Sequence, residues 1–126
     1  MVLFNKIQIG KSAEEQACKF LLAEGLELLQ KNYRCFHGEI DLIMRDKEDI
    51  VFVEVRSRSR TDYGRASESI NVNKKKKLIK TATHFLQIKD WLYKVNSRFD
   101  VVAIHFQPGN MELEWIKNAF TGVRST

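Results

Sequence analysis

Two stretches of the chain repeat apolar residues every three or four positions, which is the spacing of one face of a helix. The first covers residues 12–24, with Ser12 suited to the N-cap and Gly25 to the C-terminal stop. The second covers residues 73–87. Their apolar stripes comprise Ala13, Ala17, Phe20 and Leu21 in the first and Leu78, Ala82, Phe85 and Leu86 in the second. The pattern predicts two amphipathic helices.

Shorter apolar runs predict strands over residues 26–34, 39–45, 50–57, 99–106 and 111–116. Polar turns at residues 46–49 and 107–110 join two pairs of these runs into β-hairpins. The third run is apolar on both faces, as is typical of a central strand. The order α-β-β-β-α-β-β predicts an α/β (α+β) fold in which helices pack against a central mixed sheet.

The length of 126 residues fits a single domain over residues 1–126, and a composition that is 44% hydrophobic excludes a disordered chain. Two cysteines, Cys18 and Cys35, are too few for a disulfide framework and lack the spacing of a zinc site, so we interpret them as reduced thiols. No apolar stretch is long enough to span a membrane or to form a signal peptide. We therefore expect a soluble, cytoplasmic protein with no membrane partner.

The net charge of +5 arises from residues 56–80, a segment that contains nine basic residues and only two acidic ones. The basic residues include Arg58 and Arg60 and a run that opens the second helix: Lys74, Lys75, Lys76 and Lys77. Cations at a helix N-terminus oppose its dipole, whereas a bound phosphate would be favoured there. We interpret these six residues as contacts to a nucleic acid backbone; the alternative is a solvated charge run. No base-reading motif is visible, which favours recognition of shape or structure.

The first hairpin contains a cluster of charged residues. In its simplest register, with the turn centred on residues 47–48, Asp41 lies directly opposite Glu54, and Glu39 lies opposite Arg56. Strand side chains alternate between faces, so all four would share one patch. Directly opposed like charges destabilise a sheet. Carboxylates held this close are suited to binding Mg²⁺, Mn²⁺ or Ca²⁺.

The residues alone leave other interpretations of this patch open. Arg56 and a neighbouring Lys could neutralise the acids, or the register could slip so that the acids point apart. Glu39 could form a simple cross-strand ion pair with Arg56. Spacing by itself does not decide between these arrangements and a metal site.

Several further residues are interpreted as structural. His37 is assigned to a turn and His84 is isolated, since no histidine spacing indicates a transition-metal site. Asp100 lies in an apolar strand and is assigned as the partner of a nearby arginine such as Arg98. Trp115 is assigned to the core.

The motifs resemble those of the YraN-like family of small bacterial proteins. The strings that carry the resemblance are GEIDLI at residues 38–43, FVEVR at 52–56, GKSAEEQACKFL at 10–21, KKKKLIKTA at 74–82, RFDVV at 98–102 and EWIKNAF at 114–120. That family is placed in the PD-(D/E)xK nuclease superfamily, close to archaeal Holliday-junction resolvases. The resemblance implies a restriction-endonuclease-like fold and a divalent-metal-dependent endonuclease that hydrolyses phosphodiesters of DNA, including branched or structured DNA.

The resemblance also implies roles for individual residues. Asp41 matches the metal-binding aspartate, Glu54 matches the acid of the (D/E)xK motif, and Glu14 matches a helix-borne acid of the resolvase-like branch. These three would hold one or two Mg²⁺ (or Mn²⁺) ions. Arg56 stands at the position of the motif's lysine, where it could orient water or phosphate but could not act as a general base. Resolvase-like relatives act on DNA as homodimers.

Two other functions compete with a nuclease. One is a nucleic-acid-binding module without catalysis, in which the acidic patch is vestigial or structural. The other is an adaptor of a DNA repair or recombination complex. Arg56 weakens the enzyme hypothesis relative to both, because the usual catalytic lysine is missing.

Overall fold

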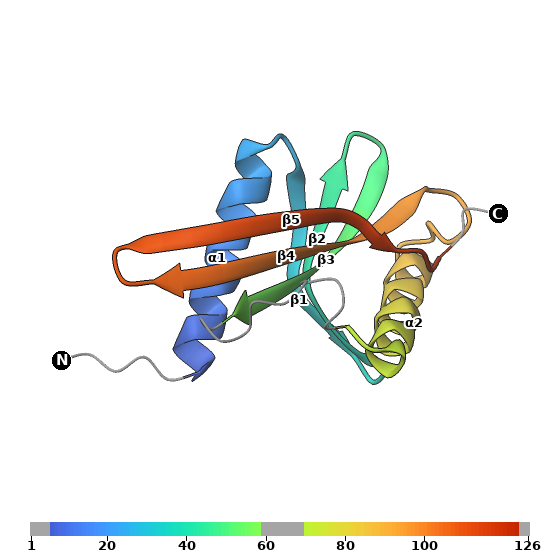
Figure 1. Ribbon diagram of the computed structural model, residues 1–126. Helices are drawn as coiled ribbons and strands as arrows, with labels where there is room; N and C mark the ends of the chain where they lie inside the picture. Colours follow the sequence, from blue (N-terminus) through green and yellow to red (C-terminus); the bar gives the residue numbers. More distant parts are fainter. Residues whose placement is uncertain (1–5, 59–69, 124–126) are drawn as a thin grey trace.

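The computed structural model describes residues 6–58 and 70–123, with side chains from residue 11 to 57 and from 70 to 123. Two helices and five strands follow in the predicted order. The elements are α1 (Lys6–Ala23), β1 (Glu27–Cys35), β2 (Gly38–Asp46), β3 (Asp49–Arg58), α2 (Val72–Ile88), β4 (Ser97–Gln107) and β5 (Asn110–Phe120). The strands form one sheet in the order β1-β2-β3-β4-β5 (Figure 1). The β3–β4 pair is parallel and the other pairs are antiparallel, which confirms the mixed sheet with β3 at its centre.

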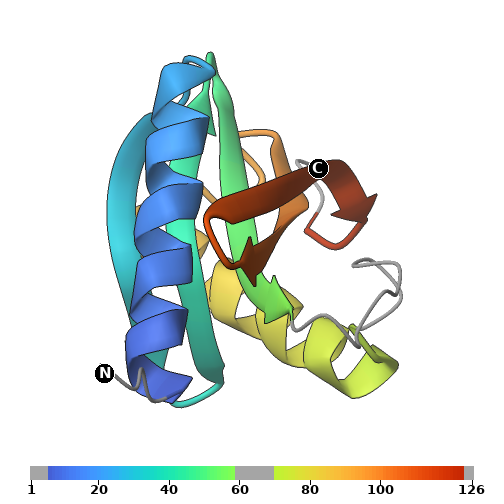
Figure 2. The ribbon, with the colours of Figure 1, turned by 60° about the vertical axis from the view of Figure 1, so that its left-hand side comes forward.

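The helices lie on opposite sides of the sheet, as Figure 2 shows. Residues of α1 such as Ala17 and Leu21 pack with Leu42 and Val53 on one face, and Cys18 is buried there as a free thiol. Residues of α2 such as Phe85 pack on the other face. Burial on both faces explains why the central strand is apolar at consecutive positions.

The N-terminus of α1 differs from the prediction. The helix begins at Lys6, so Ser12 lies in its interior and the assignment of Ser12 as N-cap was wrong. The helix continues through Gly10 and Ser12 because a glycine or serine in a helix interior is at most about 1 kcal/mol less favourable than alanine. The C-terminal stop is confirmed: Gly25 has a φ of +98°, and its N–H donates to the carbonyl of Leu22 at 3.0 Å.

Helix α2 begins at an asparagine cap. The side-chain oxygen of Asn71 accepts a hydrogen bond of 2.8 Å from the backbone N–H of Lys74. This bond satisfies one of the N–H groups that the first turn leaves without a helical partner. The cap fixes the backbone of Lys74, whose side chain reaches the candidate site.

Asn71→Ala is expected to lower the free energy of unfolding by about 1 kcal/mol, because alanine cannot accept that hydrogen bond. Asn71→Ser should retain most of the stability. Urea denaturation followed by circular dichroism measures the difference. Asn73→Ala, an exposed position without the capping bond, is the matched control. An equal loss in both variants would contradict the capping role.

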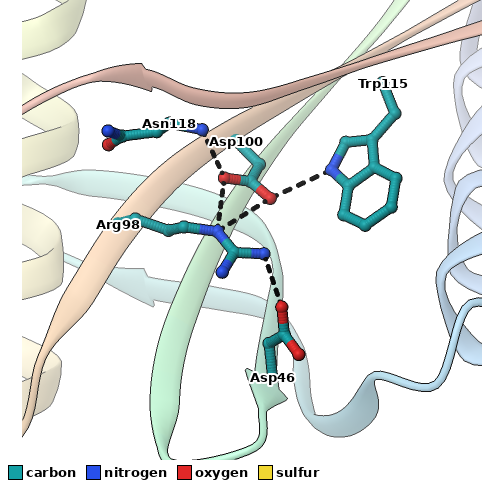
Figure 3. Close-up of polar contacts among 5 residues, drawn as sticks. All are labelled: Asp46, Arg98, Asp100, Trp115 and Asn118. Carbon is teal, nitrogen blue, oxygen red and sulfur yellow. Dashed lines mark hydrogen bonds and ion pairs between the residues drawn. The ribbon is translucent and has the colours of Figure 1, made fainter.

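A buried carboxylate joins β4 to β5 (Figure 3). Asp100 accepts hydrogen bonds from Arg98 Nε at 3.0 Å, from Trp115 Nε1 at 3.0 Å and from the backbone N–H of Asn118 at 2.9 Å. Asn118 lies in an irregular part of β5, between the positions paired with Phe99 and Val101. The assignment of Asp100 as the partner of Arg98 is confirmed, although its side chain is fully buried.

Candidate functional site

Strands β2 and β3 separate at Asp41. The observed pairs run from Asp46↔Asp49 to Leu42↔Val53, in the predicted register, and end there. At the next position the carboxylate of Asp41 accepts a hydrogen bond of 2.8 Å from the backbone N–H of Val55. Figure 1 shows the start of β2 and the end of β3 pointing in different directions. Where the β2–β3 ladder ends, the N–H of Val55 thus donates to the side chain of Asp41 instead of to a main-chain carbonyl of β2.

The packing of β2 shows the same break. Ile40 and Leu42 are two residues apart and would share one face of a regular strand. Instead Ile40 belongs to the core beneath α2 and Leu42 to the core beneath α1. Asp41 therefore lies at the boundary between the two faces, where groups from both helices can reach it.

Three acids meet at this boundary. The carboxyl group of Glu54, on β3, lies within hydrogen-bonding reach of Asp41, as does the carboxyl group of Glu14 on α1. The hairpin register predicted that Asp41 and Glu54 would be neighbours. Only the position of α1 across the sheet brings Glu14 to them.

The environment favours the protonated form of two of these acids. Burial raises the pKa of Glu54 to about 8, with a further contribution from Asp41, while the charges of Lys74 and Arg56 act in the opposite direction. Burial and then Asp41 also raise the pKa of Glu14. Crowded, poorly solvated carboxyl groups of this kind are typical of functional sites, where a cation or a bound proton must compensate their charge.

The four lysines at residues 74–77 lie in different environments. Lys74 Nζ lies 3.5 Å from Glu54 Oε2, and that oxygen is buried and accepts no hydrogen bond from the described residues. Lys75 lies over the ring of Phe120, with Nζ 5.6 Å from the centroid. Lys76 and Lys77 are exposed. The sequence treated all four as equivalent phosphate contacts, whereas the structure brings Lys74 into the acid cluster.

The arginines are placed less uniformly. Arg56 is half-buried and close enough to Glu54 for its charge to lower the pKa of that carboxyl. Arg58 pairs through its backbone with His105 at the end of β3. Its side chain, and the whole of Arg60, lie outside the described residues.

Glu39 does not lie where the simple register placed it. Its partner in the strand ladder is Arg34 of β1, and the two form an ion pair at 3.3 Å. The β2–β3 ladder ends before it could set Glu39 opposite Arg56. The prediction failed because the strands separate at Asp41, so the register does not continue to residue 39.

One neighbour of the site gave no signal in the sequence. With its amide nitrogen turned toward the acids, Asn32 of β1 donates to Glu14 at 3.3 Å and to Glu39 at 3.0 Å. Asn32 has a φ of +51°, in the left-handed region that asparagine tolerates better than most residues. It links β1 to α1 beside Asp41.

The acids of the site could supply two carboxylate ligands to a divalent cation, but not a complete set of protein ligands. Among residues 6–58 and 70–123, no group of three or more His, Cys, Asp or Glu side chains could hold a metal ion. Mg²⁺ commonly takes one or two carboxylates and completes its coordination with water and substrate phosphate. Asp41 and Glu54 provide such a pair, and Glu54 Oε2 is a buried acceptor without a hydrogen bond.

Comparison with known proteins establishes the family. The model of the uncharacterised protein family UPF0102 matches residues 13–104, which include all three acids and the lysine run. The chain belongs to the UPF0102 family. A UPF0102 protein of Stutzerimonas stutzeri is 49% identical over 111 residues, covering 88% of this chain and 92% of that protein. One from Pseudomonas savastanoi pv. phaseolicola is 47% identical over 115 residues, covering 90% and 93%.

Membership of UPF0102 confirms the YraN-like resemblance seen in the motifs. A solved structure of Pyrococcus furiosus SfsA in complex with Ca²⁺ covers 86% of this chain and 62% of its own, with 15% identity and a TM-score of 0.38. Similarity at that level supports no conclusion. Among the described residues, neither helix is long and apolar enough to cross a membrane.

Proposed function

We propose that this UPF0102 protein is a divalent-metal-dependent nuclease of the PD-(D/E)xK superfamily that hydrolyses phosphodiesters of DNA. The observation that carries the proposal is the meeting of Glu14, Asp41 and Glu54 where β2 and β3 separate, with Lys74 against Glu54. Burial and the neighbouring Asp41 disfavour the charged form of Glu54, so its carboxylate destabilises the free protein wherever it is ionised. Such a cluster is readily explained if Asp41 and Glu54 share a cation.

Asp41 and Glu54 would hold Mg²⁺ or Mn²⁺. A divalent ion bound there would lower the pKa of coordinated water and neutralise charge on a phosphate. The backbone N–H of Val55 orients the Asp41 carboxylate, and Glu14 supports it from the α1 side. Both contacts hold Asp41 in place independently of substrate.

The basic groups of the site would divide the role of the usual motif lysine. The guanidinium group of Arg56 could bind phosphate oxygens through two N–H groups. Lys74 places an ammonium group beside Glu54 from the capped end of α2. Arg58, Arg60, Lys76 and Lys77 would extend the contact along the nucleic acid backbone.

We expect the enzyme to work in the cytoplasm. We also expect it to act as a homodimer when both strands of a branched DNA are cut.

Asp41→Asn is expected to abolish metal binding and to reduce cleavage by more than about 100-fold, because even outer-shell partners of a metal contribute 10- to 100-fold. Calorimetric titration with Mn²⁺ and Mg²⁺ measures binding. Labelled duplex, single-stranded and four-way-junction DNA are the cleavage substrates. Glu48→Gln, an exposed acid in the β2–β3 turn, is the matched control and should behave as wild type.

Two results would count against the enzyme. Wild-type protein that binds no Mn²⁺ even with DNA present would exclude the metal site. Wild-type protein that binds DNA in a salt-dependent way, but cleaves none of the substrates with Mn²⁺ bound, would favour the binding module, which the arginine at position 56 also favours.

A further inference from the structure

Three aromatic rings cluster beside α2, one of them exposed and two half-buried. Phe36 lies in the turn between β1 and β2, and its side chain is 88% exposed. The His37 ring lies 3.9 Å from it between centroids, and the His84 ring of α2 lies 6.5 Å from Phe36 and 6.3 Å from His37. We call Phe36, His37 and His84 the aromatic platform. The sequence assigned His37 to a turn, which is confirmed, and left His84 isolated, which was wrong.

The platform is held in a defined position. The hydroxyl of Tyr33 forms a hydrogen bond with His84 Nδ1, and the Tyr33 ring packs edge-on against Phe85 in the core. A Cβ added at Gly38 would meet Thr81 Oγ1 at 3.2 Å, so the turn rests closely on α2. Figure 1 shows this turn beside the first half of the helix. The His84 ring and the turn that carries Phe36 and His37 are therefore fixed relative to the helix that carries the lysine run.

Cations flank the platform on the same side of α2. Lys77 and Lys80 precede His84 by seven and four residues, which places all three side chains on one helical face. Both lysines are exposed. An accessible ring beside exposed ammonium groups matches a nucleotide, whose base stacks on the ring while its phosphate is neutralised.

We propose that the aromatic platform stacks an unpaired base of a nucleic acid bound along α2. The inference rests on the proposed function and specifies its substrate: a strand with at least one unpaired base near the site of cleavage. His84 follows Lys74 by ten residues, about 15 Å along a helix. A base on the platform thus lies only a few nucleotides from the acid cluster.

A protein partner fits this surface less well. A single exposed phenylalanine supplies at most about 250 Å² of apolar area, whereas stable protein interfaces bury about 1,200–2,000 Å². The surrounding lysines favour an anionic ligand. The core does not require the Phe36 ring, because nearly all of its surface faces solvent.

Phe36→Ala is expected to weaken binding of single-stranded and gapped DNA by roughly 5- to 150-fold, while affinity for blunt, fully paired duplex stays unchanged. Fluorescence anisotropy at fixed salt gives the affinities. Quenching of 2-aminopurine placed at successive positions of the unpaired strand reports stacking directly. Phe36→Trp should retain both effects. Tyr93→Ala removes a ring that is 61% exposed outside the platform and is the matched control.

The outcomes separate this inference from the proposed function. Wild-type affinity and quenching in Phe36→Ala would overturn the platform and leave the nuclease proposal intact. An equal loss for paired and unpaired DNA would overturn the preference for an unpaired base. Wild-type protein that binds no nucleic acid at low salt would overturn both.

Discussion

Asp100→Ala is expected to lower the free energy of unfolding by roughly 3–5 kcal/mol, the usual cost of removing one partner of a buried ion pair. Natural domains are stable by only about 5–15 kcal/mol, so this single change should remove a large share of the total. The cause lies in what the carboxylate holds together. Its two oxygens serve Arg98, Trp115 and the backbone of Asn118 (Figure 3).

An alanine at position 100 would remove the hydrogen-bond acceptor of all three donors. The side chain of Arg98 is only 18% exposed and would keep Asp46 as its remaining ion-pair partner, at 3.0 Å. Burial by itself lowers the pKa of Arg98, yet the hydrogen bonds and charges of Asp100 and Asp46 outweigh it and raise that pKa. The N–H of Asn118 would lose its acceptor where β5 departs from regular pairing with β4.

Urea denaturation monitored by tryptophan fluorescence measures the loss. Asp100→Asn retains an acceptor oxygen and should show a smaller decrease, which provides a measurement if the alanine variant does not fold. Asp90→Asn removes the charge beside exposed Lys94 and is the control, with little change expected, because asparagine also tolerates the φ of +59° at this position. A loss below about 1 kcal/mol in Asp100→Ala would show that the cluster does not anchor β5.

The sequence was sufficient for the strands, the two hairpins and the central strand, because these features depend on local or periodic patterns. The polar turn at residues 46–49 sets the hairpin register, and the register predicted that Asp41 and Glu54 would be neighbours. The apolar positions of β3 identified the central strand. These features depend on alternation and turn chemistry, which a single sequence carries.

The remaining parts of the site depend on tertiary placement. Glu14 reaches Asp41 because α1 crosses the sheet at that point, and Lys74 differs from Lys76 only because one of them faces Glu54. His84 joins His37 across 47 residues of chain through the packing of α2 on the β1–β2 turn. No periodic pattern encodes such distances. The resemblance to a known family identified the acids, whereas their contacts required the structure.

Glu54→Gln is expected to stabilise the metal-free protein increasingly as pH rises from about 5, with the full gain reached above pH 8. The pKa of Glu54 is about 8 in the folded chain against an ordinary value of 4.5. Between these values the folded state binds more protons than the unfolded state, so wild-type stability falls as pH rises through this window. Glutamine carries no charge and removes that decrease. The variant should equal wild type near pH 5 and exceed it by a few kcal/mol near pH 8.5.

Added Mn²⁺ should stabilise the wild type, leave Glu54→Gln unchanged, and so narrow the difference between the two proteins at high pH. An ion at 100 times its Kd stabilises the wild type by about 2.7 kcal/mol through mass action, whereas Glu54→Gln lacks the carboxylate that binds it. Thermal unfolding from pH 5 to 9, with chelator and with Mn²⁺, tests both halves, and Glu48→Gln is the control. A structural ion pair with Lys74 predicts the opposite: Glu54→Gln would lose stability at every pH and respond to Mn²⁺ like the wild type. A carboxylate that destabilises the free fold and stabilises it only with a cation present acts as a metal ligand.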